Sequence, residues 1–166
     1  MNFGAEEIIF VCDMGGVLAD SSHRKKYQVR KDYKKFYSNE EVAKDDPIEL
    51  GIALANTISK SADYTIILTA RNERCEKATK EWLDKNGVKY DEVLFRGLTE
   101  WVSASEYKKA EVEKLLQFKD EGTKIFYIDD SYENVRNVCN ISSNIAGMTF
   151  KVIDKEKKDA CQTWII

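Results

Sequence analysis

The chain has 166 residues, of which 43% are hydrophobic and 33% charged, a composition typical of a globular domain with one core. The formal net charge of −3 argues against a protein that coats nucleic acid, although it is compatible with a local basic patch. No segment is long and apolar enough to span a membrane, and the start of the chain lacks a signal-peptide pattern. We therefore expect one cytoplasmic domain over residues 1–166, with no membrane partner; the sequence leaves its oligomeric state open.

Strand and helix patterns alternate along the chain. Apolar runs rich in β-branched and aromatic residues predict buried strands at residues 7–12, 64–68, 92–95, 124–128 and 148–153. Between them, the spacing of apolar residues predicts helices within residues 45–60, 73–87, 105–122 and 131–142. This alternation is typical of an α/β fold, with a Rossmann-like parallel sheet flanked by helices.

Capping residues set the expected ends of these helices. Asp46 would cap the first helix, and Pro47, the only proline, suits its first helical position. Ser105 is expected to begin the third helix and Gly122 to end it, as Gly87 ends the second.

Residues 20–45 interrupt the alternation with a polar, basic and aromatic segment. We expect a small helical cap insertion that lies over the end of the sheet, and not a second domain. A solvated amphipathic helix without a function is the alternative. The aromatic residues of the segment could stack on a base, but packing against the sheet is the favoured interpretation. The sequence does not assign a role to residues 154–166.

The cysteines and the single histidine give little evidence for a metal site or a nucleophile. The cysteines are Cys12, Cys75, Cys139 and Cys161; they form no CxxC pair and no zinc spacing, so we expect reduced thiols in or near the core. His23 is the only histidine, and nothing else in the sequence supports a Cys–His or Ser–His pair.

Polar side chains follow three of the predicted strands. Asp13 ends the first strand, residues 69–71 (Thr-Ala-Arg) follow the second, and Asp129 and Asp130 follow residues 124–128. The carboxyl ends of parallel strands meet at one edge of a sheet, where ligands bind. Carboxylates gathered there need a counter-ion, and a divalent cation that prefers oxygen ligands, Mg²⁺ above all, would supply it.

The loop after the first strand indicates phosphoryl transfer. Gly15 and Gly16 would let backbone amides approach phosphate oxygens closely, and Thr69 could bind another. A carboxylate such as Asp13 can attack phosphorus when a metal offsets the charge of both partners. The two lysines within residues 106–112 could complete the neutralisation.

Four motifs in the same order resemble the haloacid dehalogenase superfamily of phosphatases: "DMGGVL", "ILTAR", "YKKAEV" and "YIDDS". The resemblance covers about residues 6–153. It implies a Mg²⁺-dependent phosphatase that acts through an aspartyl-phosphate. The implied catalytic residues are Asp13 as nucleophile, Thr69 on the transferring phosphoryl oxygens and Lys109 as the neutralising cation. The implied metal ligands are Asp13, Asp129, the supporting Asp130 and the backbone carbonyl of Gly15.

Lys109 is preferred to Lys108 because it lies three residues before Val112, which matches the spacing in the family. The loop residue Gly16 and Ala70, next to Thr69, are included among the substrate contacts.

A second resemblance concerns the substrate. The segments "DSSHR", "DYKKFY" with "DDPIEL", and "LTARNE" are similar to small phage and bacterial phosphatases related to the phosphatase domain of phage polynucleotide kinase and to phage deoxynucleoside monophosphatases. This resemblance implies a 5′-nucleoside monophosphate or a polynucleotide 3′-phosphate end, and a cytoplasmic location that would be a host's if the protein is phage-encoded. His23, Arg24 and Arg71 would then face the substrate, since arginine suits bidentate phosphate contacts. Plain surface cations are the alternative for the arginines.

Gly15 departs from the family pattern, which has an aspartate there as general acid and base. Glycine cannot move a proton, and the loss of such a group typically costs roughly 10²–10⁴ in rate. Three interpretations stay open. The chain is a phosphatase altered at this one position, or a non-catalytic protein that binds a nucleotide or phosphate, or an enzyme whose proton transfer falls to the substrate or to His23.

Overall fold

A five-stranded parallel sheet forms the centre of the protein. The structure, a computed structural model, describes residues 7–99, 102–119 and 122–152. The sheet has the order β5-β4-β1-β6-β7, and every neighbouring pair is parallel. Its strands are β1 (Ile8–Cys12), β4 (Tyr64–Asn72), β5 (Glu92–Arg96), β6 (Lys124–Asp129) and β7 (Ile145–Thr149). The expected α/β fold with a parallel sheet is thus confirmed.

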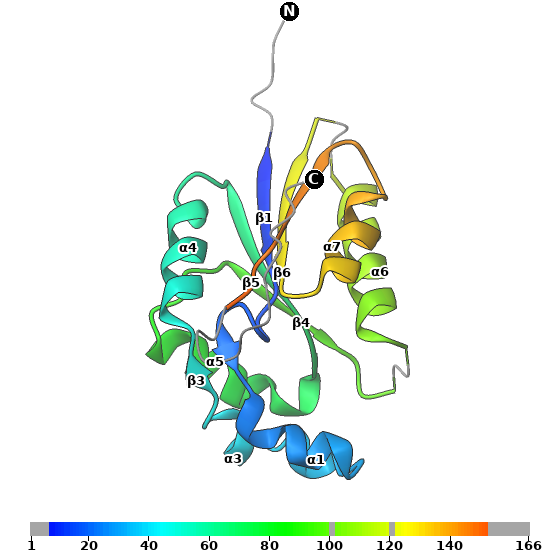
Figure 1. The fold of residues 1–166 in the computed structure, drawn as a ribbon. Coiled ribbons are helices and arrows are strands. Elements are labelled where there is room, and N and C mark those ends of the chain that lie inside the picture. The colour runs from blue at the N-terminus through cyan, green and yellow to red at the C-terminus, as the bar shows by residue number, and fades with distance from the viewer. Residues whose placement is uncertain (1–6, 100–101, 120–121, 153–166) are drawn as a thin grey trace, which may run out of the picture.

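Two layers of helices cover the sheet. Helices α4 (Glu49–Ser59) and α5 (Glu76–Lys85) lie on one side, and α6 (Ala104–Gln117) and α7 (Tyr132–Cys139) lie on the other (Figure 1). The central strand β1 serves both layers: Phe10 and Cys12 belong to one apolar cluster, whereas Ile9 and Val11 belong to the other. Burial of both faces explains why this strand is apolar throughout instead of alternating. Within the described ranges, no helix has the length and apolar character of a membrane span.

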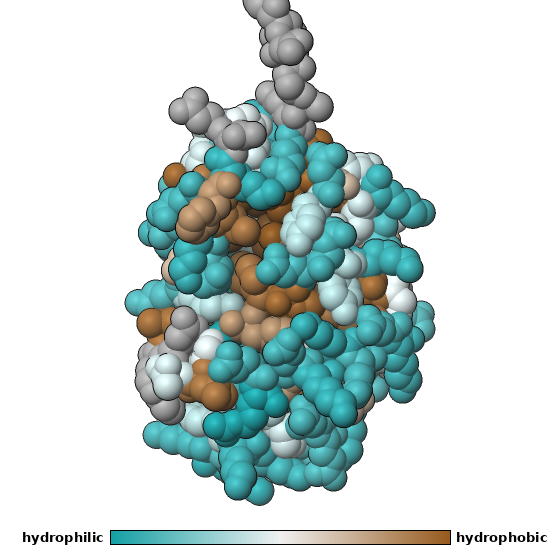
Figure 2. All heavy atoms as spheres, turned by 180° about the vertical axis from the view of Figure 1, so that it is seen from behind, coloured by the Kyte–Doolittle hydropathy of each residue, from teal (hydrophilic) through white to brown (hydrophobic). Residues whose placement is uncertain are grey.

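A cap lies at the carboxyl ends of the strands (Figure 1). It leaves the sheet after β1 through the short strand β2 (Ala19–Asp20) and returns through β3 (Asp46–Pro47), which pairs antiparallel with β2. Between these strands lie the 3₁₀ helix η1 and three short helices: η1 (Ser22–Arg24), α1 (Lys25–Val29), α2 (Tyr33–Phe36) and α3 (Asn39–Val42). Seen from behind, the cap end is mainly hydrophilic, whereas apolar side chains gather across the middle of the molecule (Figure 2).

Three element boundaries differ from the predictions. Asp46 and Pro47 do not begin a helix: they form β3, and α4 starts at Glu49 after the Ile48 N–H has donated to the Leu18 carbonyl. The long-range pairing with β2 therefore overrides the local preference of proline for a helix start. The last strand is Ile145–Thr149, not residues 148–153, because its register is set by its pairing with β6.

The third boundary is the start of α6. Ser103, not Ser105, caps this helix, because Ser103 accepts from the Glu106 N–H while the Glu106 side chain accepts from the Ser103 N–H. This reciprocal capping box satisfies two backbone donors and outweighs a single cap two residues later. Of the predicted helix ends, Gly87 follows α5 with a φ of 67°, while Gly122 lies beyond a stretch that includes undescribed residues 120–121. The segment 154–166 lies outside the described residues.

Candidate active site

The register of the central strands brings two aspartates together. Cys12 of β1 pairs with Ile128 of β6, so the next residues, Asp13 and Asp129, are neighbours at the carboxyl edge of the sheet. The Asp13 N–H continues the ladder by donating to the Ile128 carbonyl over 2.8 Å. Asp130 joins them, and one oxygen of each of the three carboxylates lies within 4.8 Å of the others. The predicted meeting of acids at this edge is therefore a feature of the structure.

Lys108 supplies the cation at this edge. Its Nζ lies 2.9 Å from Asp13 Oδ1 and 2.7 Å from Asp129 Oδ2, and the side chain is almost fully buried. Lys109, the predicted residue, instead pairs with Glu113 on the exposed face of α6. The prediction was wrong because Lys108 lies in the middle of the buried face of α6 that Tyr107, Val112 and Leu115 define, whereas Lys109 lies at the edge of that face.

Asp129 is held by four hydrogen bonds. Its Oδ2 accepts from the Lys108 ammonium and from the Tyr127 hydroxyl, and its Oδ1 accepts from the Ser131 N–H and the Asn134 side-chain amide. A carboxylate has about four lone-pair sites, so all of them are used in this arrangement. A cation that binds Asp129 directly would replace one of these donors.

Negative charge exceeds positive charge at this edge, and the pKa values reflect the imbalance. Burial raises the pKa of Asp13 to about 7, against the opposing effect of Lys108, and the Asp129 carboxylate adds to the rise. Burial and then Asp129 also raise the pKa of Asp130. Burial alone would lower the pKa of Lys108, but the carboxylates of Asp13 and Asp129 hold it above its usual value. One ammonium thus does not neutralise three acids.

The loop after β1 turns tightly over these acids. The N–H groups of Leu18 and Ala19 both donate to the Met14 carbonyl, and the Gly16 N–H donates to the Ala19 carbonyl. Gly16 needs to be glycine, since its φ is 77° and a Cβ there would lie 2.4 Å from Asp130 Oδ2. Gly15 is different: among the described residues, no heavy atom beyond its chain neighbours lies within 4 Å of the place its Cβ would take. A side chain at position 15 therefore has room.

Thr69 lies on the other side of Asp13. Because Cys12 pairs with Ile67 of β4, Thr69 lies one residue beyond the position next to Asp13. Thr69 is buried, and its Oγ1 accepts from the Arg71 N–H, which leaves its hydroxyl proton to donate. Ala70 lines a cavity beside this strand end.

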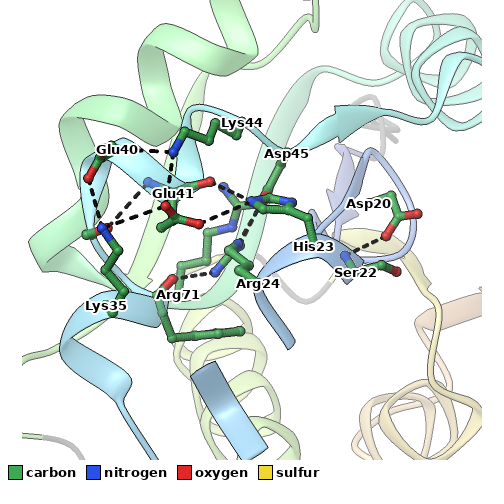
Figure 3. Close-up of polar contacts among 12 residues, drawn as sticks. Asp20, Ser22, His23, Arg24, Lys35, Glu40, Glu41, Lys44, Asp45 and Arg71 are labelled. Atoms are coloured by element: carbon green, nitrogen blue, oxygen red, sulfur yellow. Dashed lines mark hydrogen bonds and ion pairs between the residues drawn. The ribbon is translucent and has the colours of Figure 1, made fainter. Parts of the chain in front are cut away.

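Arg24 and Arg71 lie in a buried cluster beneath the cap, which we call the Asp45 cluster (Arg24, Asp45, Arg71). Arg24 binds both carboxylate oxygens of Asp45, over 2.7 and 2.8 Å, and Arg71 Nη2 binds Asp45 Oδ2 (Figure 3). Arg24 Nη1 also donates to the Phe36 carbonyl, and Arg71 Nη1 donates to the Thr79 hydroxyl. The expectation that these arginines present themselves to a substrate is corrected, because each is at most 5% exposed and bound to Asp45.

His23 also points toward this cluster (Figure 3). Its Nε2 is 3.1 Å from the Glu41 carbonyl, and its Nδ1 is 3.8 Å from Asp45 Oδ1. Both ring nitrogens thus face cap residues, so the structure gives no support to His23 as a substrate contact or as a substitute for the missing acid and base.

The three carboxylates fit a divalent cation with oxygen ligands. Opposite ligands around Mg²⁺ lie about 4 Å apart, and one oxygen from each of the three carboxylates lies within 4.8 Å of the others. The excess negative charge is the second argument, because a cation would relieve the repulsion that raises the pKa of Asp13 and Asp130. The acids are therefore suited to holding a divalent cation.

Sequence reasoning ranked one residue of this region too low and missed two others. Lys108 could have been preferred to Lys109, because it lies in the middle of the helix face that Tyr107, Val112 and Leu115 define. Tyr127 lies two residues before Asp129, so strand alternation places both side chains on one face of β6. The sequence around Asp45 does not indicate its role, since an acid before "DP" is typical of a turn or a helix cap. Only the fold brings Asp45 to Arg24 and Arg71, which are distant in the sequence.

Comparisons with known proteins agree with this architecture. No protein-family model and no curated protein matches the sequence. Among solved structures, a chain of the Pnkp1/Rnl/Hen1 complex is 17% identical, with a TM-score of 0.67 over 90% of this chain and 48% of that one. A chain of the Pnkp1/Rnl/Hen1 RNA repair complex is 19% identical, with the same TM-score, over 89% and 43%. The HAD domain of the effector Lem4 from Legionella pneumophila is 13% identical, with a TM-score of 0.51, over 88% and 86%.

These likenesses show the fold. The chain has the α/β fold of the haloacid dehalogenase type, as its motifs indicated. It spans about half the length of the chains from the Pnkp1 complexes.

Proposed function

We propose that the protein is a phosphatase-type hydrolase in which Asp13 attacks the phosphorus of a phosphate monoester. The observation that carries this proposal is the group of Asp13, Asp129 and Asp130 with Lys108 at one sheet edge. In the first step, an Asp13 oxygen bonds to phosphorus, the ester bond breaks, and the leaving alkoxide takes up a proton from solvent water. In the second step, water releases inorganic phosphate and restores the carboxylate.

The neighbouring residues divide the work around Asp13. The Lys108 ammonium orients Asp13 and offsets charge on the phosphoryl group, and the Thr69 hydroxyl donates to one of its oxygens. Asp13, Asp129, Asp130 and the Gly15 carbonyl would hold Mg²⁺. The ion would supply charge neutralisation for the attack of one anion on another.

Gly15 makes turnover slow in this proposal. Nothing at position 15 can protonate the leaving group or activate water, so we expect a rate roughly 10²–10⁴ below that of a chain with an acid there. The open space at Gly15 supports this view, because a Cβ there would have no described heavy atom within 4 Å beyond its chain neighbours. The second candidate is a non-catalytic protein that binds a nucleotide or phosphate. Gly15 favours this candidate too, because glycine cannot transfer a proton.

The substrate class proposed is a nucleotide, either a nucleoside monophosphate or a polynucleotide 3′-phosphate end. Its support is the resemblance of the motifs and the likeness to chains of an RNA repair complex, of which this chain spans about half the length.

Restoring the acid tests the proposal. We expect Gly15→Asp to hydrolyse nucleoside monophosphates or 3′-phosphorylated oligonucleotides with Mg²⁺ about 10²–10⁴ faster than the glycine form. Gly15→Asn is the matched control, because it fills the same space without a titratable group and should gain little.

Two other outcomes decide between the candidates. Tight binding of nucleotide without hydrolysis in either form would favour the non-catalytic binder. If no form binds or hydrolyses any phosphate ester, both candidate functions are wrong.

A further inference from the structure

A cavity of about 430 Å³ lies between the cap and the ends of β4 and β5. Its size falls within the range of small-molecule sites. The cavity lies beside the sheet edge that carries Asp13, Asp129 and Asp130, because Ala70 in its wall follows Thr69 directly. Ala104, also in the wall, lies one helical turn before Lys108 on α6. The two elements that supply Thr69 and Lys108 therefore also border this cavity.

The cavity is lined for an anion. Arg74 and Arg96 are the charged residues among its described lining, and no Asp or Glu accompanies them, although the chain has 29 acids and 26 basic residues. Arg96 donates to the Tyr37 hydroxyl and the Val102 carbonyl, both neutral. Within the described ranges, the guanidinium of Arg74 pairs with no carboxylate and the side chain is exposed. Two guanidinium groups that pair with no carboxylate of the described residues thus line one small space.

The same cavity offers aromatic surface. Tyr33 is 49% exposed at its wall, and Tyr37 beside it is fixed by the hydrogen bond from Arg96. Phe36, by contrast, is buried under the Arg24 guanidinium and is not available to a ligand. An exposed tyrosine face can stack on a planar base, and a nearby guanidinium can bind a phosphate bidentately.

We propose that this cavity binds the leaving group of the substrate, with the base against Tyr33 and a second phosphate on Arg74 and Arg96. This inference rests on the proposed function and narrows its substrate: a nucleotide with a second phosphate is preferred over a nucleoside monophosphate. A free nucleoside bisphosphate and the 3′-phosphorylated end of a strand share this chemistry. A neighbouring cavity shares Tyr37 and Arg74 and adds Asp32, Lys34 and Lys35. Lys35 pairs with Glu40, so Lys34 is the lysine of this lining that extends the cationic surface.

The test compares ligand affinities of the chain with Gly15 by calorimetry in the presence of Mg²⁺. Adenosine 3′,5′-bisphosphate should bind about 10-fold or more tightly than adenosine 3′-monophosphate, because it adds a charge-assisted contact. Arg74→Ala should abolish this gain and leave the monophosphate affinity within about two-fold. Arg30→Ala is the matched control: it removes the same charge from an exposed cap position that lines neither cavity.

A 3′-phosphorylated trinucleotide shows whether the ligand is a strand end or a free nucleoside bisphosphate. Tighter binding than the bisphosphate, lost in Lys34→Ala, identifies a strand end, and equal affinity identifies the free nucleotide. Equal binding of mono- and bisphosphate, or equal losses in Arg74→Ala and Arg30→Ala, overturns the inference. Turnover of p-nitrophenyl phosphate by Gly15→Asp reports the proposed function independently, since that ester carries no second phosphate.

Discussion

The sheet edge with Asp13, Asp129, Asp130 and Lys108 and the Asp45 cluster are both buried charge clusters, yet their charge balances have opposite signs. At the edge, three carboxylates share the Lys108 ammonium, whereas beneath the cap two arginines share the Asp45 carboxylate. The edge is left with acids whose pKa is raised by burial and mutual repulsion. In the cluster, burial lowers the pKa of Arg71 to about 10, which still leaves it charged at neutral pH.

Hydrogen bonds explain why the excess of positive charge in the Asp45 cluster is tolerated. Arg24 also donates to the neutral Phe36 carbonyl and Arg71 to the neutral Thr79 hydroxyl, and Trp82 donates to the Asp45 carbonyl. Asp45 comes from the cap, while Arg71 and Thr79 come from the body of the domain, so the cluster fixes the cap over the site. Charge excess alone therefore does not mark a ligand site; an excess on groups with unused lone pairs does.

The largest effect is expected where the cluster loses its carboxylate. Asp45→Asn would leave two buried guanidinium groups without a counter-ion, and we expect unfolding to become about 3–5 kcal/mol easier. Urea denaturation measures this change. Asp46→Asn is the control, since Asp46 is the exposed neighbour in β3 and should cost less than about 0.5 kcal/mol. Equal costs for the two variants would show that the cluster does not hold the fold.

The second largest effect is expected on kcat/KM when Lys108, the cation beside Asp13 and Asp129, is replaced. In the Gly15→Asp form, Lys108→Met should lower kcat/KM by about 10²–10³, the usual cost of removing a charged group that stabilises a transition state. Lys109→Met should stay within about two-fold, because that side chain pairs with Glu113 in solvent. Circular dichroism would verify that both variants fold. A larger loss from Lys109→Met would contradict the placement of Lys108 at the site.

The comparison also separates what the sequence can reveal from what it cannot. The edge was largely predictable, because Asp13, Thr69, Asp129 and Asp130 each follow a strand whose apolar run is evident, and parallel strands end at one edge. The choice between Lys108 and Lys109 failed because family spacing was given more weight than the helix face that Val112 defines.

The Asp45 cluster was not predictable in the same way. Arg24, Asp45 and Arg71 are far apart in sequence and show no periodic pattern, so only the path of the cap brings them together. The missed start of α4 has the same origin, since Pro47 joins a strand that residues 19–20 complete from a distance. Local signals identify strand ends reliably, whereas contacts made by a returning insertion need the fold itself.

The smallest effect follows from the excess negative charge on Asp13. Its pKa in the folded protein, about 7, lies above the value of 3.8 for a free aspartate. The folded state therefore loses stability as pH rises from about 4 to 7, because the unfolded chain releases this proton first. Asp13→Asn mimics the protonated acid, so without metal it should be more stable than the natural chain at pH 8 and similar at pH 4. We expect about 1–2 kcal/mol at pH 8, less than the full shift implies, because a site without metal admits water.

Thermal denaturation in EDTA at both pH values measures this difference. Asp20→Asn provides the control of opposite sign, because a hydrogen bond from Ser22 lowers the pKa of Asp20, so this variant should lose stability at pH 8. Adding Mg²⁺ should stabilise the natural chain more than Asp13→Asn and narrow the gap, since the ion needs the ionised carboxylate. A natural chain that is as stable as Asp13→Asn at pH 8 in EDTA would mean that Lys108 alone neutralises the edge. The difference between the two buried clusters would then not lie in their charge.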